Sequence, residues 1–301
     1  MTEYTIIIPS RNIPDLLQRA LDSIPRRKDI QVIVVDDASD PSYVDFSLYP
    51  GLGDPRFELL FLKDHLGAGH ARNVGLGQAS GRWTLFLDSD DFFLPACFEL
   101  LDSHKGDDAD IVFFNVTSVY SDDLSPSGRH LSRSEYFTSY DGARREFCCR
   151  YLYSEPWGKM FRTDFLRGGA FRFDETPLAN DYRFSVMTGL AAGRVVTDPR
   201  PLCCITERRG SLSHDFCSTP LQLSTRLAVY RDVQEILDSA GVRSYPFYKL
   251  VNFTLRHRKG MKDILRDFCS DRRINYNSLR FKVLFYRILF SRWHRRHWAI
   301  F

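Results

Sequence analysis

The first hundred residues repeat one pattern, in which a short apolar run ends in a cluster of polar or charged residues. The runs at residues 5–8, 31–35 and 83–87 are each followed by such a cluster. Short runs that are apolar at every position are typical of strands buried on both faces, which requires a parallel sheet covered by helices. Ligands bind beyond the carboxyl ends of the strands in such sheets, so we expect the polar clusters to converge on one cleft.

The segments between these runs fit the same architecture. Apolar residues recur at helical spacing over 14–24, with Pro14 in the first turn and Asn12 as a candidate N-cap. A third apolar run at 57–62 precedes the Gly-rich segment 67–75, which is expected to open a helix that Gly81 ends. The order of strands and helices predicts an α/β fold with a mostly parallel, Rossmann-like sheet and flanking helices.

The second half of the chain is less regular. Residues 121–134 are polar and are predicted to form a loop. Strands are expected at 110–119, 194–198 and 202–206, and helices at 141–151, 181–190, 221–240 (ended by Gly241) and 248–268 (interrupted at Gly260).

Length and cysteine content indicate a cytoplasmic protein. The 301 residues suffice for one large domain or a domain with an appendage. The first apolar run stops at Pro9, so no signal peptide is expected, and no stretch reaches the roughly 20 apolar residues of a membrane-spanning helix. The seven cysteines are odd in number and lack CxxC spacing, so we expect buried thiols without a zinc or redox role.

Three carboxylates, Asp88, Asp90 and Asp91, follow the apolar run at 83–87 within four positions. Like charges at this spacing repel, so a positive group is expected among them. Oxygen ligands of this kind suit Mg²⁺ or Mn²⁺, which often bind substrate phosphates with their remaining positions. The alternative is a solvated turn whose aspartate caps a helix begun by Pro95.

In combination, these motifs resemble a known family. Residues 4–91 contain TIIIPSRN, VIVVDDASD and GAGHARNVGLGQASGRWTLFLDSDD, in the order and spacing of the nucleotide-binding half of a family 2 glycosyltransferase with the GT-A fold. WGKMFR at 157–162 and PLANDYRF at 177–184 resemble later segments of that family. The resemblance implies a GT-A catalytic domain over 1–215, with a nucleotide-sugar half (1–105) and an acceptor-side half (106–215), followed by a helical C-terminal region (216–301).

The resemblance also implies binding roles for individual residues. Asp88 would bind the ribose or nearby sugar hydroxyls, with Ser89 beside it, and Asp90 would ligate the metal, with Asp91 as a second candidate. Arg72 would face the nucleotide from the Gly-rich helix. The residues expected to hold the base are Pro9, Arg11 and Asp37, with Asp36 beside them. The alternatives are turn chemistry at a strand end for Asp36 and Asp37, and an ordinary surface cation for Arg72.

Asp181 matches the position of the family's catalytic base. Displacement at an anomeric carbon needs a carboxylate within hydrogen-bond reach of the acceptor hydroxyl. In this chain Asn180 stands where the family has a Glu. This difference is expected to affect binding of the acceptor substrate more than proton transfer to Asp181. The alternative for Asp181 is an acid at a helix N-terminus, where the macrodipole favours it.

Two basic segments complete the candidate site and its surroundings. Arg208, Arg209 and His214 follow the last predicted strand and resemble a family segment that closes over the diphosphate, although an ordinary basic loop is equally open. Residues 272–301 hold eight Lys and Arg and no acid. A helix over 278–298 would combine cations with an apolar face, which suits an anionic membrane surface. Alternatives are packing against protein, and nucleic-acid binding, which no recognised module supports.

The resemblance implies an inverting transferase that uses Mg²⁺ or Mn²⁺. The expected donor is a UDP-sugar, and the expected acceptor is a saccharide, lipid-linked or free, in capsule or lipopolysaccharide assembly. One alternative is a sugar-nucleotide pyrophosphorylase, which would carry a Gly-rich loop directly after the first strand, where this chain has Pro9-Ser-Arg-Asn. The other is a non-catalytic protein that keeps the nucleotide cleft, which only Asn180 favours.

Overall fold

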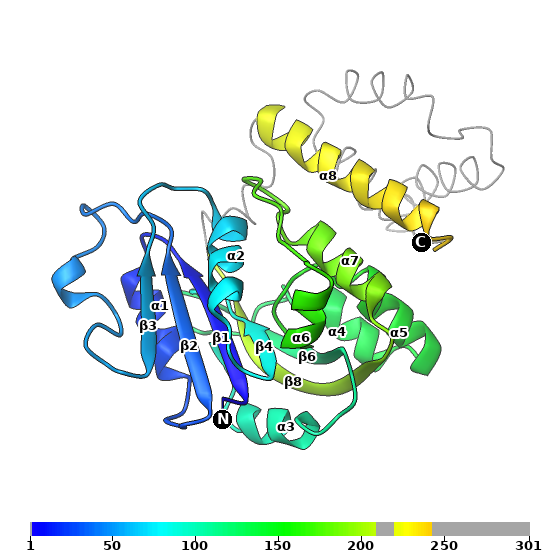
Figure 1. The fold of residues 1–301 in the computed structure, drawn as a ribbon, viewed down its shortest axis with the longest axis horizontal. Coiled ribbons are helices and arrows are strands. Elements are labelled where there is room, and N and C mark those ends of the chain that lie inside the picture. The colour runs from blue at the N-terminus through cyan, green and yellow to red at the C-terminus, as the bar shows by residue number, and fades with distance from the viewer. Residues whose placement is uncertain (1, 209–219, 243–301) are drawn as a thin grey trace, which may run out of the picture. The chain divides into compact units, whose positions relative to one another are not determined.

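The sheet is the centre of the fold. In the computed structural model, the described residues are 2–208 and 220–242, and all of them belong to a first compact unit, Met1–Ser244. Within residues 2–208, eight strands form one sheet in the order β3-β2-β1-β4-β7-β6-β8-β5 (Figure 1). The first four strands in this order are parallel. They are β1 (Tyr4–Ser10), β2 (Ile30–Asp36), β3 (Phe57–Phe61) and β4 (Trp83–Phe86).

Both faces of β1, of most of β2 and of β4 are buried, as the continuous apolar runs predict, whereas the edge strand β3 is partly exposed. Ile33 and Val35 of β2 pack with Ala71 of α2 (Ala68–Gln78) in one cluster. Their neighbours Val32 and Val34 belong to the main core, which also holds Leu17, Ala20 and Leu21 of α1 (Pro14–Asp22). Since successive residues of a strand point to opposite faces, α1 and α2 cover opposite sides of the sheet.

Two predicted helix boundaries are wrong. Asn12 does not cap α1: its φ is 59°, its Oδ1 accepts from the Asp40 N–H at 2.8 Å, and Ile13 occupies the N-cap position. Gly81 does not end α2, which stops at Gln78 with Ala79 as C-cap. A Cβ on Gly81 would lie 2.7 Å from the Thr5 nitrogen, so this glycine is needed for close packing against β1.

The second half of the sheet adds antiparallel pairs, so the sheet is mixed, although most of its pairings are parallel as predicted. β7 (Lys159–Arg162) runs antiparallel to both β4 and β6 (Ile111–Tyr120), and the short β5 (Phe92–Phe93) runs antiparallel to β8 (Val195–Glu207). β6 and β8 pair in parallel, with register shifts around Asn115. The two strands predicted at 194–198 and 202–206 are therefore one long irregular strand.

Helices surround this half of the sheet. The helices predicted at 141–151 and 181–190 are present, whereas α4 begins inside the segment predicted as a loop. These helices are α3 (Cys97–His104), α4 (Leu131–Thr138), α5 (Gly142–Tyr151), α6 (Thr163–Gly168) and α7 (Tyr182–Ala191), whereas η1 (Phe46–Leu48) lies between β2 and β3 in the chain.

α8 (Pro220–Ser239) confirms the helix predicted over 221–240. Its Val229, Val233 and Leu237 pack with Tyr182 and Val186 of α7. The predictions for Arg209, His214, the helix at 248–268 and the basic segment 272–301 lie outside the described residues. The five described cysteines are buried free thiols, as expected.

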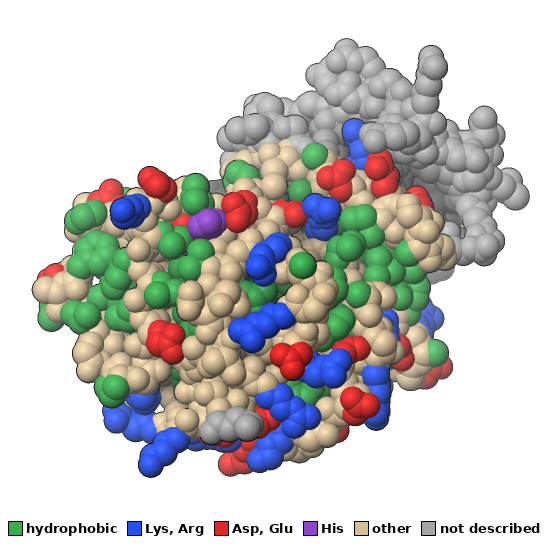
Figure 2. Space-filling view, in the orientation of Figure 1, with side chains coloured by type: hydrophobic (Ala, Val, Ile, Leu, Met, Phe, Trp, Pro, Cys, Tyr) green, Lys and Arg blue, Asp and Glu red, His purple; other side chains and the backbone are tan. Residues whose placement is uncertain are grey.

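Exposed apolar side chains gather around the β3 edge of the sheet. Figure 2 shows hydrophobic side chains over the side of the molecule where β3 lies. The exposed large apolar residues in this part of the chain include Tyr43, Leu48, Leu52 and, in β3 itself, Phe61. Over the described ranges, a helix with the length and hydropathy needed to span a membrane is not found.

Candidate functional site

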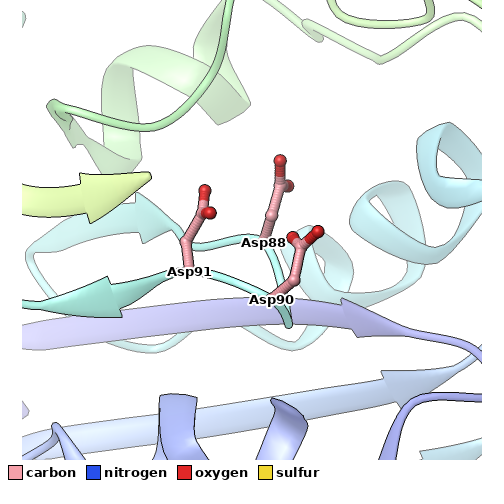
Figure 3. A group of neighbouring side chains, drawn as sticks. All are labelled: Asp88, Asp90 and Asp91. Atoms are coloured by element: carbon pink, nitrogen blue, oxygen red, sulfur yellow. The ribbon is translucent and has the colours of Figure 1, made fainter. Parts of the chain in front are cut away.

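The acidic cluster lies at the end of β4, in the loop that leads to β5. One carboxylate oxygen from each of Asp88, Asp90 and Asp91 lies within 4.8 Å of the others. Figure 3 shows the three carboxylates directed to the same side of the loop. The loop turns tightly, since the Asp91 N–H donates to the Asp88 carbonyl at 2.9 Å, and Ser89 between them is buried.

Two residues outside the motif hold this loop in place. The Arg19 guanidinium of α1 donates to the Asp90 carbonyl at 2.7 Å, and the Thr206 hydroxyl of β8 donates to the same oxygen at 2.8 Å. The Thr206 N–H donates to Oδ1 of Asp91 at 2.7 Å. Neither partner has a local signal in the sequence, because both contacts join segments far apart in the chain.

The three ionised carboxylates of the cluster repel one another unless a cation lies close to them. Burial raises the pKa of Asp91 well above its usual range, and the Asp90 and Asp88 carboxylates raise it further. The pKa of Asp90 is also raised, first by burial and then by Asp88, while Arg208 and Arg129 oppose the change. Oδ2 of Asp91 is buried and has no hydrogen-bond partner within the described part of the chain. An oxygen in this state fits a divalent cation.

Arg72 is the positive group that the acidic run requires. This buried residue of α2 donates to Oδ1 of Asp88 at 2.5 Å and to Oδ1 of Asn180 at 3.0 Å, and its guanidinium lies 5.3 Å from the Phe173 ring centroid. The side chain is therefore not an ordinary surface cation. Through it, the acidic loop is linked to the residue before Asp181.

The beginning of α2 is pressed against the segment 173–181. A Cβ on Gly69 would lie 2.0 Å from the Asp174 carbonyl oxygen, so only glycine fits there. Asn73 exchanges two hydrogen bonds with the Phe173 backbone, at 2.8 and 3.0 Å, and His70 pairs with Glu175 at 2.9 Å. These contacts bring the predicted nucleotide side and acceptor side together.

Asp181 occupies the N-cap position of α7 and makes no side-chain capping bond among the described residues. Burial raises its pKa to about 6, the Glu155 carboxylate adds to the rise, and Arg72 opposes it. A carboxyl group with this pKa can accept a proton near neutral pH. Asp181 thus lies at the N-terminus of α7, as its alternative also predicts, directly after the Asn180 that binds Arg72, and its carboxylate makes no capping bond among the described residues.

The aspartates after β2 are engaged in local structure. Asp36 accepts from the N–H and hydroxyl of Ser39 at 2.7 and 2.6 Å and from the Tyr49 hydroxyl at 2.9 Å. Asp37 accepts the N–H groups of Leu66 and Gly67, each at 2.9 Å, and so fixes the loop that leads into α2. Both carboxylates are buried; the Ser39 contacts of Asp36 match the predicted alternative of turn chemistry, whereas Asp37 binds a loop distant in the chain.

Other predicted residues lie at the same edge of the sheet. Pro9 is a buried residue of β1 paired with Val35, and Arg11 is exposed directly after that strand. Arg208 follows β8 and acts electrostatically on Asp90. Arg129 was not predicted; it donates to the Thr206 carbonyl and acts on both Asp90 and Asp91.

Sequence and structure comparisons agree on the relationship of this chain. A family model described as glycosyl transferase family 2 matches residues 5–169. The chain is 29% identical over 219 residues to the succinoglycan biosynthesis protein ExoO of Rhizobium meliloti, which covers 70% of this chain and 62% of that protein. It is 25% identical over 221 residues to the poly(ribitol-phosphate) beta-N-acetylglucosaminyltransferase TarS of Staphylococcus aureus, 70% of this chain and 36% of the relative.

A solved structure shares the fold. The crystal structure of S. aureus TarS 1–349 in complex with UDP-GlcNAc superposes with a TM-score of 0.61 at 19% identity, over 94% of this chain and 78% of that one. The chain spans less than two thirds of the length of ExoO and of full-length TarS. Because the family model covers more than half of the chain and the fold is GT-A like, the chain belongs to glycosyl transferase family 2.

Proposed function

We propose that this protein is a metal-dependent inverting glycosyltransferase that moves a sugar from a nucleotide diphosphate to a saccharide. The observation that carries the proposal is the Arg72 bridge, which joins Asp88 of the acidic loop to Asn180, the neighbour of Asp181. A transferase needs a site for a donor phosphate beside a proton acceptor for the incoming hydroxyl. The contacts of Arg72 support such an arrangement.

The donor we propose is a UDP-sugar. The related TarS 1–349 crystallised as a complex with UDP-GlcNAc, which supports this donor class. Asp90 and Asp91 would hold Mg²⁺ or Mn²⁺, with Asp88 and Ser89 toward the ribose and sugar, and Arg72 toward the nucleotide. Bound there, the ion would neutralise charge on the diphosphate. For the base we propose Pro9, Arg11 and Asp37, with Asp36 supporting the loop, and for the diphosphate Arg208, Arg209 and His214.

Asp181 is the proposed base. Its carboxylate would take the proton of the acceptor hydroxyl while that oxygen forms a bond to the anomeric carbon. The bond from the anomeric carbon to the diphosphate oxygen breaks at the same time, and its electron pair leaves with the nucleoside diphosphate. Attack from the opposite side inverts the anomeric centre. The raised pKa of Asp181 supports this role, because a base near its pKa accepts a proton readily at neutral pH.

The acceptor we propose is a growing cell-surface polysaccharide, lipid-linked or free. Relatives named for polysaccharide synthesis include ExoO, the amylovoran biosynthesis glycosyltransferase AmsB of Erwinia amylovora and a Campylobacter jejuni glucosyltransferase whose name includes an undecaprenol-linked acceptor. These names support the acceptor class.

The decisive experiment compares the wild type with Asp181→Asn. Purified protein is incubated with Mn²⁺, a panel of UDP-sugars and saccharide acceptors, and released UDP and product are measured. We expect transfer by the wild type and loss of at least about a hundredfold in Asp181→Asn, with the dissociation constant for UDP unchanged. Full turnover by the variant would remove Asp181 from the role of base.

The same assay separates the alternative functions. A non-catalytic protein would bind UDP-sugar but release no UDP with any acceptor or with water. A pyrophosphorylase would form a nucleoside triphosphate when pyrophosphate is added. No contact among the described residues specifically favours either alternative, since Asn180 takes part in the Arg72 bridge and leaves the Asp181 carboxylate in place.

The location we propose is the cytoplasmic side of the membrane, with the basic segment 272–301 on an anionic surface. Sedimentation with phosphatidylserine-containing vesicles tests this. Deletion of residues 272–301 should abolish the sedimentation, and unchanged sedimentation would refute the membrane role of the segment.

A further inference from the structure

Lys159, the first residue of β7, is a fully buried lysine on the acceptor side of the fold. Only 1% of it is exposed. Its Nζ donates to the Tyr153 carbonyl at 2.6 Å and to the Ser185 hydroxyl at 3.2 Å, and it lies 4.8 Å from the Tyr153 ring centroid. A buried ammonium is costly unless its charge and its hydrogens are compensated. Its retention in the core therefore calls for an explanation.

The hydrogen bonds of Lys159 lead to the helix that carries Asp181. Ser185 accepts from Lys159, its hydroxyl donates to the Ser154 carbonyl at 2.6 Å, and its N–H donates to the Asp181 carbonyl at 3.0 Å. Ser185 thus closes the first turn of α7 and is itself fixed by the lysine. In this way Lys159 braces the backbone at the position where Asp181 is held.

The charges around this point are balanced in number. Arg133 of α4 forms an ion pair with Glu155. The Glu155 carboxylate acts electrostatically on both Lys159 and Asp181, so these groups form two cations and two carboxylates. Arg72 and Asp88 also act on Asp181, Cys149 of α5 acts on Lys159, and Asp181 acts on Tyr230 of α8.

Nearby carboxylates, Asp181 among them, favour the charged form of Lys159. Burial lowers the pKa of Lys159 to about 7, against the opposing effect of the Glu155 and Asp181 carboxylates. Burial raises the pKa of Asp181 to about 6, and Glu155 adds to the rise. At a pH between these values the lysine is charged and the aspartate is ionised. Loss of the lysine charge would leave three carboxylates, Glu155, Asp181 and Asp88, with two arginines, Arg133 and Arg72.

We propose that Lys159 is a positioning residue for Asp181, because its ammonium fixes the first turn of α7 and supplies the positive charge that favours the carboxylate form of Asp181. The inference rests on the proposed transferase function. It assigns a role to a buried residue that is not among the proposed binding residues.

The test is the pH dependence of kcat/KM for Lys159→Met. The acid limb of this profile reports the ionisation of the essential base in the free enzyme. We expect the limb to move upward by about half a pH unit or more, since a nearby positive charge is removed. The dissociation constant for UDP should stay within about twofold of wild type. Lys63→Met, at an exposed lysine, is the charge-matched control and should leave the limb in place.

A second variant, Ser185→Ala, tests the bracing of α7 separately from the electrostatic effect on Asp181. Ser185→Ala retains the ammonium but removes its link to α7, so we expect a lower kcat with the acid limb unmoved. A folded Lys159→Met with the wild-type acid limb would overturn the electrostatic role, and Ser185→Ala with wild-type kcat would overturn the bracing role, even if Lys159→Met fails to fold. Absence of transfer by the wild type would instead refute the proposed function.

Discussion

Replacement of Asp90 by Asn should make the metal-free protein more stable and its metal-bound form less so. Three carboxylate oxygens lie within 4.8 Å of one another. Two unit charges at that distance repel by on the order of 3 kcal/mol at an effective dielectric constant near 20. The substitution removes one of these charges without touching the Asp90 carbonyl that Arg19 and Thr206 hold. We therefore expect a gain of about 1–3 kcal/mol in the free energy of unfolding without metal.

When Mn²⁺ is added, we expect Asp90→Asn to be less stable than the wild type. A ligand that binds only the folded state at a hundred times its dissociation constant contributes about 2.7 kcal/mol. For a chain of 301 residues, that corresponds to a rise in Tm of about 4 °C in the wild type. Asp90→Asn should lose most of this rise, since it loses an anionic ligand.

Differential scanning fluorimetry at about pH 7.5, with EDTA or with Mn²⁺ and UDP, measures both effects. Asp108→Asn, at an exposed aspartate outside the cluster, is the charge-matched control and should behave as wild type. If Asp90→Asn keeps the wild-type response to Mn²⁺, or destabilises the metal-free protein, the acidic loop is not a cation site held under mutual repulsion.

Three further outcomes follow from the same contacts. Because the pKa values of Asp90 and Asp91 are raised in the folded state, the metal-free protein should lose stability as pH rises above about 4, the unfolded value, and Mn²⁺ should reduce that loss in urea titrations across pH. Gly69→Ala should destabilise by at least about 1–3 kcal/mol, whereas Gly77→Ala in the same helix, where nothing lies within 4 Å, should stabilise by up to about 1 kcal/mol; equal effects in chemical denaturation would contradict the close approach at Gly69. Arg72→Met should cost about 1–3 kcal/mol and weaken UDP binding in calorimetry, and wild-type values for both would exclude the bridge as a structural element.

The sequence predicts the parallel half of the sheet well because the relevant signals are local. The apolar runs of β1, β2 and β4 are bounded by Pro9, by Asp36 and by Asp88, and each boundary is visible without knowledge of the fold. The second half is harder to predict, because β7 has four residues and β8 is bent by register shifts. A strand of that length is defined by its partners more than by its own pattern.

The same distinction applies to the site. The acidic run and the Gly-rich helix are contiguous motifs, and the family resemblance assigns Asp181 to the correct helix end. The partners that hold these groups, Arg19, Arg129 and Thr206, come from separate elements and form no motif of their own. The cap prediction for Asn12 is wrong because a residue with a side-chain amide suits both a helix cap and a left-handed turn, and the tertiary contact with Asp40 decides between them.

The contacts of α2 have a consequence for attempts to redesign this protein. One helix supplies Arg72 to the acidic loop while Gly69 and Asn73 lie against the segment that ends at Asp181. A graft of this helix from a relative with another donor preference would therefore also transplant the spacing between the two reactants. On the proposed roles of Arg72 and Asp181, donor choice and acceptor geometry should be inherited together, and we expect a productive chimera to exchange α2 and residues 173–181 as one module.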